Sequence, residues 1–196
     1  MSLPSIVLAS SSPRRQEILG SSGLLFSTAS AQGPETDDPS LGLAGLVLTN
    51  AAAKAREIAE SYPQSIVIGA DTLVWLNDQP LGKPADLKEA RQMLERLSDC
   101  WHEVATGVHL HQLEPPRQLG FHEVTRVRFH SLDEPTITAY LKRVDVLDKA
   151  GAYALQEHGE MLVKSVEGSR QNVIGLPLER TLAALRCFDE RLISQS

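Results

Sequence analysis

Several features are scarce in this sequence, and each scarcity excludes a class of protein. The 196 residues include only two cysteines, Cys100 and Cys187, which supply neither a disulfide framework nor a zinc-ligand spacing. The longest apolar runs, such as residues 66–70, are far too short to span a bilayer. Nineteen Lys and Arg residues against 25 Asp and Glu leave a net charge of −6, and aromatic residues make up only 5% of the chain. We therefore expect a cytoplasmic protein that binds neither membrane nor nucleic acid.

Familiar metal and phosphate motifs are also missing. The six histidines follow no HExxH or other metal-ligand spacing. His109 and His111 share one face of a predicted strand, but no third ligand accompanies them. The GxxxxGK[ST] loop that cradles nucleotide phosphates is absent as well. Any phosphate or metal chemistry in this protein must therefore use a different arrangement.

Strands and helices alternate along the chain, which predicts an α/β protein. Apolar runs at 5–9 and 65–69 predict buried strands, the second extended by 72–76 and followed by a turn at 77–80, and alternating patterns at 104–110 and 125–129 predict an antiparallel pair. Helices are expected from Pro13, over 43–60, 87–97 and 136–143, and from Pro177. The length and a hydrophobic content of 42% suit one domain over 1–196, or two lobes that share a cleft.

The segment SSSPRR at residues 10–15 follows a predicted buried strand and opens a helix, with Ser12 as its expected N-cap. Arg14 and Arg15 in the first turn oppose the helix macrodipole, whose positive end lies there. An anion held by backbone N–H groups, serine hydroxyls and both guanidinium groups would remove this conflict. The alternative is a pair of solvated arginines, which costs little free energy.

A carboxylate and two lysines form a second candidate group. Asp71, in the sequence GADT, stands at the end of an apolar strand, where open α/β sheets place ligand-binding groups. It is suited to bind a divalent cation or to orient a water molecule. Lys54 lies on the inward stripe of its predicted helix, and Lys83 lies in a proline-restricted loop. Taken alone, these lysines are better explained by a snorkelling side chain and an exposed turn residue.

Two further residues have polar side chains suited to ligands. Glu35, in a polar loop, is a candidate to join Asp71 on Mg²⁺, which takes one or two carboxylates together with phosphate oxygens. Asp37 and Asp38 compete for the same role. Gln156 ends the segment DKAGAYALQ, and its amide both donates and accepts, which suits recognition of a nucleobase edge. The alternative for Gln156 is a buried, hydrogen-bonded amide.

Seven segments taken together resemble the Maf-like nucleotide pyrophosphatases over nearly the whole chain. In chain order they are LASSSPRR, NAAAKA, IGADT, LGKP, HEVATGV, DKAGAYALQ and EGSRQNVIGLPL. The resemblance implies a fold similar to that of inosine triphosphatases, an elongated mixed sheet flanked by helices with a cleft between two lobes. It implies hydrolysis of a nucleoside triphosphate to the monophosphate and pyrophosphate, with a divalent cation, Mg²⁺ or Mn²⁺, as cofactor.

The resemblance also implies roles for individual residues. Asp71 matches the catalytic base, and Arg14, Thr72 and Gln156 match positions linked to substrate choice. The positions expected around the phosphates are Ser10, Arg14, Arg15, Lys54 and Lys83. Glu35 matches an acidic position near the metal, with Asp71 as the other ligand, although residues 34–38 shift the paired acids that the family often has there.

The subgroup with this DKAGAY segment and Gln156 prefers dTTP and UTP, whereas the 7-methyl-GTP subgroup usually has Glu at the position of Gln156. The activity implied is therefore that of a dTTP and UTP pyrophosphatase, a nucleotide diphosphatase. Two alternatives stay open, a pyrophosphatase for a modified purine triphosphate and a non-catalytic nucleotide-binding regulator of septum formation. The resemblance also leaves a homodimer open.

Overall fold

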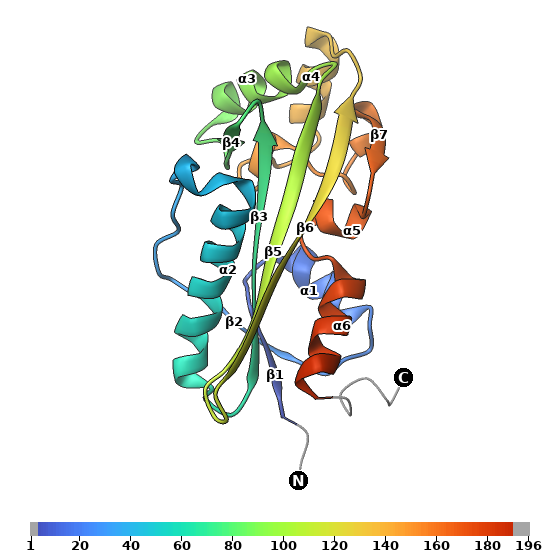
Figure 1. Ribbon diagram of the computed structural model, residues 1–196. Coiled ribbons are helices and arrows are strands. Elements are labelled where there is room, and N and C mark those ends of the chain that lie inside the picture. Colours follow the sequence, from blue (N-terminus) through green and yellow to red (C-terminus); the bar gives the residue numbers. More distant parts are fainter. Residues whose placement is uncertain (1–3, 190–196) are drawn as a thin grey trace.

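The computed structural model describes residues 4–189, which form an elongated mixed α/β structure (Figure 1). The strands are β1 (Ile6–Ala9), β2 (Ser27–Ala29), β3 (Ile66–Leu76), β4 (Gln79–Leu81), β5 (Trp101–Gln112), β6 (Arg117–Phe129) and β7 (Val163–Glu167). The α-helices are α1 (Pro13–Gly20), α2 (Gly42–Ser61), α3 (Leu87–Leu97), α4 (Glu134–Leu141), α5 (Arg170–Ile174) and α6 (Leu178–Phe188). Short 3₁₀ helices are η1 (Pro39–Leu41), η2 (Ala150–Ala152) and η3 (Gly159–Met161). Over these residues no helix has the length and apolar character needed to cross a membrane.

All seven strands belong to one sheet with the order β2-β1-β3-β5-β6-β7, and β4 pairs with β3. β1 is parallel to both β2 and β3, whereas the remaining pairs are antiparallel. The long strands β3, β5 and β6 run along the length of the molecule (Figure 1). The predicted mixed sheet flanked by helices is confirmed.

The position of Asp71 in the sheet differs from the prediction. The sequence places it at the end of a strand, but β3 continues without interruption to Leu76. The strand that ends at this level is β1, because its last residue, Ala9, pairs with Gly69. Asp71 therefore lies in the middle of β3, just beyond the carboxyl end of the parallel neighbour, where α/β sheets place ligand groups.

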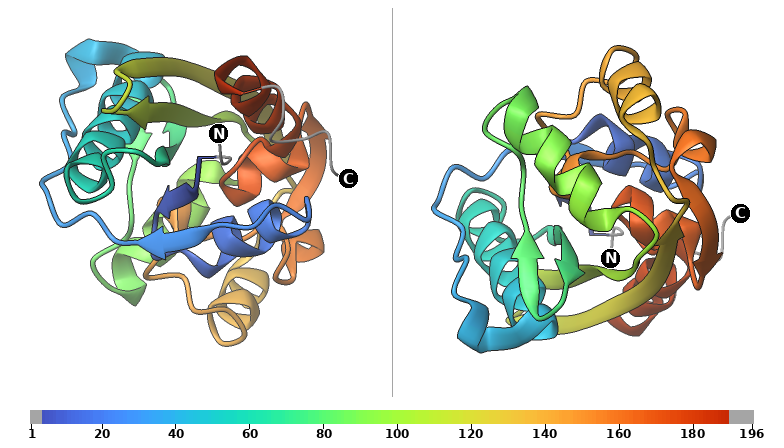
Figure 2. Two further views of the ribbon diagram at one scale, coloured as in Figure 1. Left: turned by 90° about the horizontal axis from the view of Figure 1, so that it is seen from below. Right: turned by 90° about the horizontal axis from the view of Figure 1, so that it is seen from above.

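Alternating residues of β1 and β3 face two different helix layers (Figure 2). Ile6 and Leu8 of β1 belong to a core cluster that contains residues of α1 and α6. Val7 and Ala9 belong to a cluster that contains residues of α2. Because successive side chains of a strand point to opposite faces, the continuous apolar run of β1 buries the strand on both sides.

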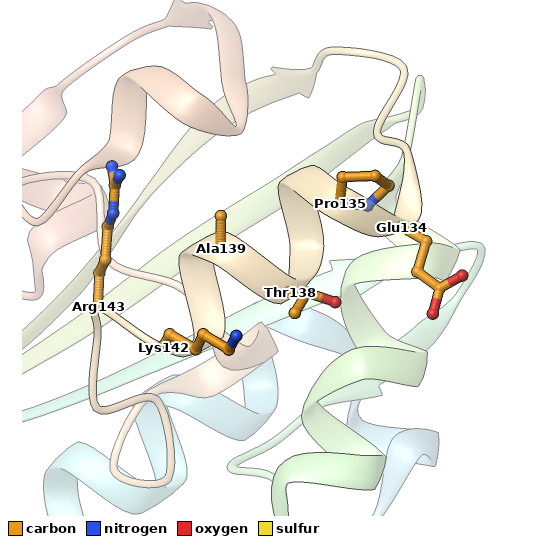
Figure 3. Close-up of a pocket in the computed structure, with 6 residues that line it drawn as sticks. All are labelled: Glu134, Pro135, Thr138, Ala139, Lys142 and Arg143. Carbon is orange, nitrogen blue, oxygen red and sulfur yellow. The ribbon is translucent and has the colours of Figure 1, made fainter.

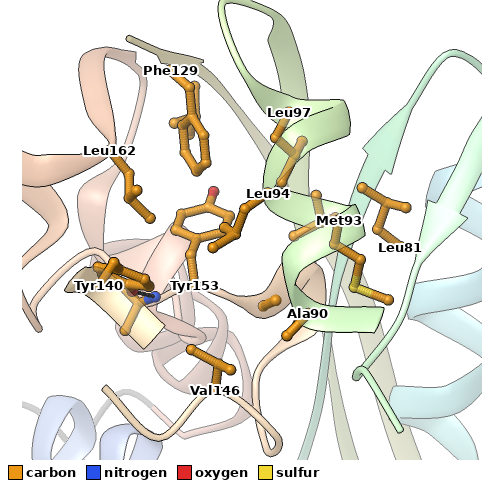
Figure 4. Close-up of a cluster of buried hydrophobic side chains, with 14 of the residues drawn as sticks. Leu81, Ala90, Met93, Leu94, Leu97, Phe129, Tyr140, Val146, Tyr153 and Leu162 are labelled. Atoms are coloured by element: carbon orange, nitrogen blue, oxygen red, sulfur yellow. Dashed lines mark hydrogen bonds between the residues drawn. The ribbon is translucent and has the colours of Figure 1, made fainter. Parts of the chain in front are cut away.

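A third core cluster fills the other end of the long strands. It joins α3 and α4 to the ends of β3, β5 and β6 and to the segment at 144–154. Tyr153 lies inside this cluster beside Phe129, with their ring centroids 4.9 Å apart (Figure 4). The hydroxyl of Tyr140 accepts a hydrogen bond from the backbone N–H of Ala154 at 2.9 Å. The segment that leads to Gln156 is thus anchored in the core.

Helix α3 has the predicted bounds, and its N-terminal cap explains why. Asp86 accepts a hydrogen bond from the backbone N–H of Glu89 at 2.7 Å, and the Glu89 carboxylate accepts one from Ala85 at 2.7 Å. The first bond satisfies a backbone N–H of the first helical turn, and the second ties the residue before the N-cap to that turn. Ser12 occupies the N-cap position of α1 as predicted, but its side chain makes no capping hydrogen bond.

The sequence does not predict the short strands β2, β4 and β7. Strands of three to five residues at a sheet edge have too few alternating positions to produce a pattern. The turn expected over 77–80 is wrong at its end, because Pro80 belongs to β4. Only Asn77 and Asp78 form the turn, with φ of 51° and 60°, as in a two-residue hairpin of type I′.

Two glycines bring α2 against the sheet at the level of Asp71. A Cβ atom on Gly69 would overlap the carbonyl oxygen of Ala51, and one on Gly107 would overlap that of Val47. Gly107 is the residue that pairs with Asp71 across β3 and β5. The absence of side chains at these glycines lets the α2 backbone approach the sheet closely.

Candidate active site

The largest group of predicted residues lines one cleft of about 810 Å³. Its walls come from the β1–α1 junction, the loop before η1, α2, β3, the loop before α3 and the segment that ends at Gln156. The predicted residues in its lining are Ser10, Arg14, Arg15, Glu35, Lys54, Asp71, Thr72, Lys83 and Gln156. Asp37 lines the same cleft, whereas Asp38, the other acid considered beside Glu35, does not.

At the centre of the cleft, the ammonium of Lys54 joins two carboxylates. Lys54 Nζ donates a hydrogen bond to Asp71 Oδ1 at 2.7 Å and lies 2.8 Å from Glu35 Oε1. Asn50 Nδ2 donates to the other Asp71 oxygen at 3.2 Å. Asn50 and Lys54 are four residues apart on α2, so both side chains project from the same face of the helix. Both oxygens of the buried Asp71 carboxylate are therefore held in place.

Glu35 is more accessible than Asp71 and is also held as an anion. Burial by itself would raise the pKa of Glu35, but the hydrogen bond and charge of Lys54 oppose it. The charges of Lys83 and Arg15 act in the same direction, so the pKa lies below its ordinary value. Glu35 is consequently ionised at neutral pH.

Arg15 extends across the floor of the cleft and is held at three points. Its guanidinium donates to the carbonyl oxygen of Gly175 at 3.0 Å, to Thr72 Oγ1 at 3.1 Å and to Ser10 Oγ at 3.4 Å. Burial lowers the pKa of Arg15, and the negative charge of Asp71 acts against that effect. The side chain is thereby fixed as a positive group next to the β1–α1 junction.

Arg14 points away from Arg15 to another part of the cleft. Its Nη1 donates to Asp148 Oδ2 at 3.0 Å. The two guanidinium groups therefore have different partners in this structure, although both line the same cleft, and their joint binding of an anion stays a prediction. The physical reason is that neighbouring residues in a helix point about 100° apart, so each arginine meets a different partner.

Thr72 is linked to a buried polar network behind the cleft. Its hydroxyl is 3.0 Å from that of Thr106, and Thr106 in turn donates to the backbone oxygen of Asn172 at 2.8 Å. The Asn172 amide nitrogen donates to the Val104 carbonyl at 2.9 Å and to Thr125 Oγ1 at 3.0 Å. Because these hydrogen bonds satisfy the buried amide, Asn172 ties three long-strand positions together behind Thr72.

Gln156 and Lys83 lie at the exposed parts of the cleft lining. Gln156 Nε2 donates to Glu157 Oε1 at 3.4 Å. The alternative that Gln156 is a buried, satisfied amide is therefore wrong. The loop of Lys83 is joined to the segment before Gln156, because Gly82 accepts a hydrogen bond from the N–H of Gly151 at 3.0 Å.

Glu35 and Asp71 are the residues of the cleft best placed to hold a divalent cation together. Their carboxylates already meet at a single positive group, the Lys54 ammonium. Two carboxylates are a sufficient protein donor set for Mg²⁺ when phosphate oxygens complete its shell. Asp38 is committed elsewhere, because it caps η1 by accepting from Ser40 at 2.9 Å, while Asp37 lines the same cleft as Glu35. The donor set therefore fits a cation that is bound together with a phosphate ligand.

No site for a protein-only metal centre is evident between residues 4 and 189, where no three His, Cys, Asp or Glu side chains cluster suitably. His109 and His111 stack with their ring centroids 5.8 Å apart, as two histidines on one strand face should. No third ligand joins them there.

A second pocket, of about 520 Å³, lies on the surface of α4 (Figure 3). It is lined by Glu134, Pro135, Thr138, Ala139, Lys142 and Arg143. All six residues come from one helix and its C-terminal end, so the pocket is not enclosed by other elements. It contains none of the residues that the sequence singled out.

Several residues of the site were not predicted from the sequence. Asn50 lies four residues before Lys54 in NAAAKA, on the same face of the predicted helix. This spacing could have identified Asn50 from the sequence. Asp148, Lys149 and Asn172 lie in motifs quoted for the family resemblance, but nothing in their spacing marks them. Their partners are distant in sequence and are brought close only by the fold.

The fold and the cleft define an α/β protein with a charged cleft beside the end of a parallel strand, the position at which such sheets bind ligands. A family model described as "Maf-like protein" matches residues 5–188, and the chain belongs to this family.

Named relatives are similar over nearly their full length. A protein of Akkermansia muciniphila named dTTP/UTP pyrophosphatase is 46% identical over 183 residues, which cover 93% of this chain and 96% of that protein. A protein of Symbiobacterium thermophilum with the same name is 44% identical, and the alignment covers 93% of each chain. One from Pelotomaculum thermopropionicum, again with that name, is also 44% identical, over 93% of this chain and 96% of its own.

Proposed function

We propose that this protein hydrolyses dTTP and UTP to the nucleoside monophosphate and pyrophosphate. The observation that supports this most strongly is the meeting of Asp71, Lys54 and Glu35 in a cleft lined by every other predicted residue. The relatives named dTTP/UTP pyrophosphatase, which match nearly the whole chain, support the same activity.

In this proposal Asp71 is the general base. Its carboxylate is held by Lys54 and Asn50, so an attacking water molecule would meet an acceptor of fixed orientation. The water attacks the α-phosphorus, and the bond to the bridging oxygen breaks with pyrophosphate as the leaving group. Asp71 takes the proton that the water loses.

Four basic side chains line the cleft near this carboxylate, namely Arg14, Arg15, Lys54 and Lys83. With the hydroxyl of Ser10, they would bind the triphosphate and stabilise the negative charge that grows on the leaving pyrophosphate. Fixed positive groups are effective here because Arg15 and Lys54 are already held by hydrogen bonds and need little reorganisation.

A divalent cation, Mg²⁺ or Mn²⁺, bound by Glu35 and Asp71 would neutralise phosphate charge and polarise the reacting phosphoryl group. The ionised state of Glu35 at neutral pH suits this role. The proposal predicts that EDTA abolishes turnover and that added Mg²⁺ or Mn²⁺ restores it.

Arg14, Thr72 and Gln156 are proposed to select the base. The amide of Gln156 both donates and accepts, which matches the N3–H and carbonyl groups of uracil and thymine. A base that covers this amide without matching its donor and acceptor would cost it the hydrogen bonds it makes to water, which disfavours the wrong base.

The decisive experiment measures pyrophosphate release from dTTP, UTP, GTP, ATP and 7-methyl-GTP, with Mg²⁺ and with EDTA. We expect release from dTTP and UTP, and a loss of about a thousandfold in kcat for Asp71→Asn. Asp78→Asn is the matched control, since Asp78 is exposed in a hairpin turn whose positive φ suits asparagine.

Near-full turnover by Asp71→Asn would refute the role of Asp71 as general base. Activity confined to 7-methyl-GTP would refute the pyrimidine preference, and binding of nucleotides without any release would favour a non-catalytic regulator. The cytoplasmic location and the homodimer that the family resemblance leaves open stay predictions. Analytical ultracentrifugation at several protein concentrations would test for the homodimer.

A further inference from the structure

Two of the three side chains proposed to select the base, Arg14 and Gln156, are far apart in sequence but are linked through a series of charged side chains. At one end, Arg14 Nη1 donates to Asp148 Oδ2 at 3.0 Å, and Arg14 Nη2 reaches the Asp148 carbonyl oxygen at 3.5 Å. The second carboxylate oxygen of Asp148 accepts from Lys149 Nζ at 2.8 Å. Asp148 therefore bridges one guanidinium and one ammonium.

The sequence of contacts continues from Lys149 to Gln156. Lys149 Nζ lies 3.7 Å from Glu157 Oε1, and the same oxygen accepts from Gln156 Nε2 at 3.4 Å. The order of groups is Arg14, Asp148, Lys149, Glu157 and Gln156. Lys149 is the central cation, with one carboxylate on each side.

Lys149 differs from its neighbours in burial. Its side chain is 7% exposed, whereas those of Asp148 and Glu157 are 54% and 42% exposed. A buried ammonium is costly unless its hydrogen bonds are satisfied, and Lys149 also donates to the carbonyl oxygen of Asp145. These contacts restrict the ammonium to one position, from which it orients both carboxylates.

The backbone around Lys149 is also fixed. Residues 149–155 are buried except for the half-buried Ala150, and Gly151 and Ala152 adopt positive φ of 68° and 59°. The N–H of Ala154 is held by the Tyr140 hydroxyl, and the N–H of Gly151 by the carbonyl of Gly82. The backbone before Gln156 is therefore fixed, and the hydrogen bond to Glu157 orients the exposed Gln156 side chain.

The Asp148 carboxyl titrates as expected for a group between two cations. Partial burial would raise its pKa, but hydrogen bonds and charges from Lys149 and Arg14 bring the pKa below the ordinary value. Asp148 thus stays ionised and neutralises part of the charge of Arg14 throughout the neutral range.

We propose that Lys149 is a positioning residue that couples Arg14 to Gln156 and thereby sets the preference for a pyrimidine base. This inference rests on the proposed function, because it assigns a determinant of base choice within the same cleft. Without the ammonium, Asp148 and Glu157 lose the cation that orients them, and both base-selecting side chains become less well defined. Among the residues proposed to bind phosphate, Arg14 is the one joined to Lys149, through Asp148. Asp71, Lys54 and Arg15 have other partners and stay in place.

The test compares Lys149→Met with Lys149→Arg, and with Lys142→Met as the matched control on the exposed end of α4. We expect Lys149→Met to raise KM for UTP and dTTP about tenfold with kcat changed less than twofold. The preference for UTP over GTP in kcat/KM should fall by a similar factor. Lys149→Arg should restore most of it, and Lys142→Met should match the wild type.

Asp148→Asn and Glu157→Gln provide second variants, because both side chains are partly exposed and the changes keep their shape. Each should lower the UTP preference, and the double variant should lower it by less than the product of the single effects, since both act through Lys149. Additive single effects, or a loss of kcat shared equally by all nucleotides in Lys149→Met, would overturn the coupling.

A readout without turnover separates this inference from the proposed function. Calorimetric binding of UMP and GMP to the same variants should show the same loss of preference. If the wild-type protein releases no pyrophosphate, the proposed function fails, while the coupling is still judged on this binding series. An unchanged ratio of UMP to GMP affinity in Lys149→Met would refute the coupling even in an active enzyme.

Discussion

One residue, Lys54, supplies the positive charge that both carboxylates of the proposed reaction share. Its ammonium lies 2.7 Å from Asp71 and 2.8 Å from Glu35, so two negative groups share one positive partner. Without it, like charges would face each other in a partly buried site and one carboxyl would be driven toward its protonated form. Lys54 therefore pairs with both carboxylates that the proposed reaction uses, and its hydrogen bond and charge lower the pKa of Glu35 against the effect of burial.

This predicts the effect of Lys54→Met, which keeps the length of the side chain and removes its charge. We expect kcat to fall about a hundredfold. The acid limb of the pH–rate profile should move to higher pH, because Lys54 is the main group that lowers the pKa of Glu35 against the effect of burial. Lys88→Met on the exposed side of α3 is the control. An acid limb unchanged in Lys54→Met would contradict the role assigned to the lysine.

At the scale of elements, the site depends on how closely α2 lies on the sheet. Gly69 and Gly107 leave room for the carbonyl groups of Ala51 and Val47, one helical turn apart. That approach places the α2 side chains at 50 and 54 beside Asp71. The distance between α2 and the sheet thus decides whether Asn50 and Lys54 reach Asp71.

Gly107→Ala tests this dependence. Its Cβ would overlap the backbone of Val47, which cannot rotate away as a flexible side chain could. We expect a loss of stability of about 1–3 kcal/mol and a fall in kcat as α2 moves from Asp71. Gly20→Ala is the control, since nothing lies within 4 Å of a Cβ there. Chemical unfolding and steady-state kinetics would measure both effects, and wild-type values in both would contradict the close packing.

For the whole molecule, the pH dependence of stability follows from buried histidines. Burial lowers the pKa of His102 to about 4 from an ordinary value of 6.5. His102 Nε2 lies 2.9 Å from the Tyr153 hydroxyl, and its Nδ1 finds no partner in the part of the chain that the structure describes. Burial also lowers the pKa of His109 to about 4, helped by the charges of His111 and Arg56.

Between pH 6.5 and about 4, the unfolded chain therefore binds protons that the folded protein does not. The free energy of unfolding should fall as the pH drops through this window. His102→Gln keeps a partner for Tyr153 and removes one titrating group. We expect it to reduce the stability difference between pH 6.5 and pH 5 by about 1.6 kcal/mol.

Urea unfolding at several pH values measures this difference. His130→Gln, at an exposed position, should leave the pH dependence as in the wild type. A pH dependence that His102→Gln does not alter would show that this histidine is protonated as readily in the folded protein as in the unfolded chain.

Local patterns predict much of the fold, and together with the family resemblance they predict most of the residues that line the cleft. Helix α3 was predicted with its bounds because its cap and its apolar stripe are both encoded within a few residues. Asp71 is predicted from its place in an apolar strand, whereas Lys54 by itself is better explained as a snorkelling side chain and Glu35 competes with two neighbouring acids. The family resemblance is what assigns all three to one site. The short edge strands were missed, since they owe their conformation to pairing with neighbours rather than to their own pattern.

By itself, the sequence determined the alternation of strands and helices, the buried strands and the set of residues that meet in the cleft. Only the tertiary structure decided how those residues are connected: that Arg14 and Arg15 diverge, that Lys54 joins Glu35 to Asp71, and that Lys149 lies between Arg14 and Gln156. Residue types and periodicity depend on neighbours along the chain, which a sequence displays directly. The direction and partner of a side chain depend on packing between segments far apart in sequence, and no local pattern encodes it.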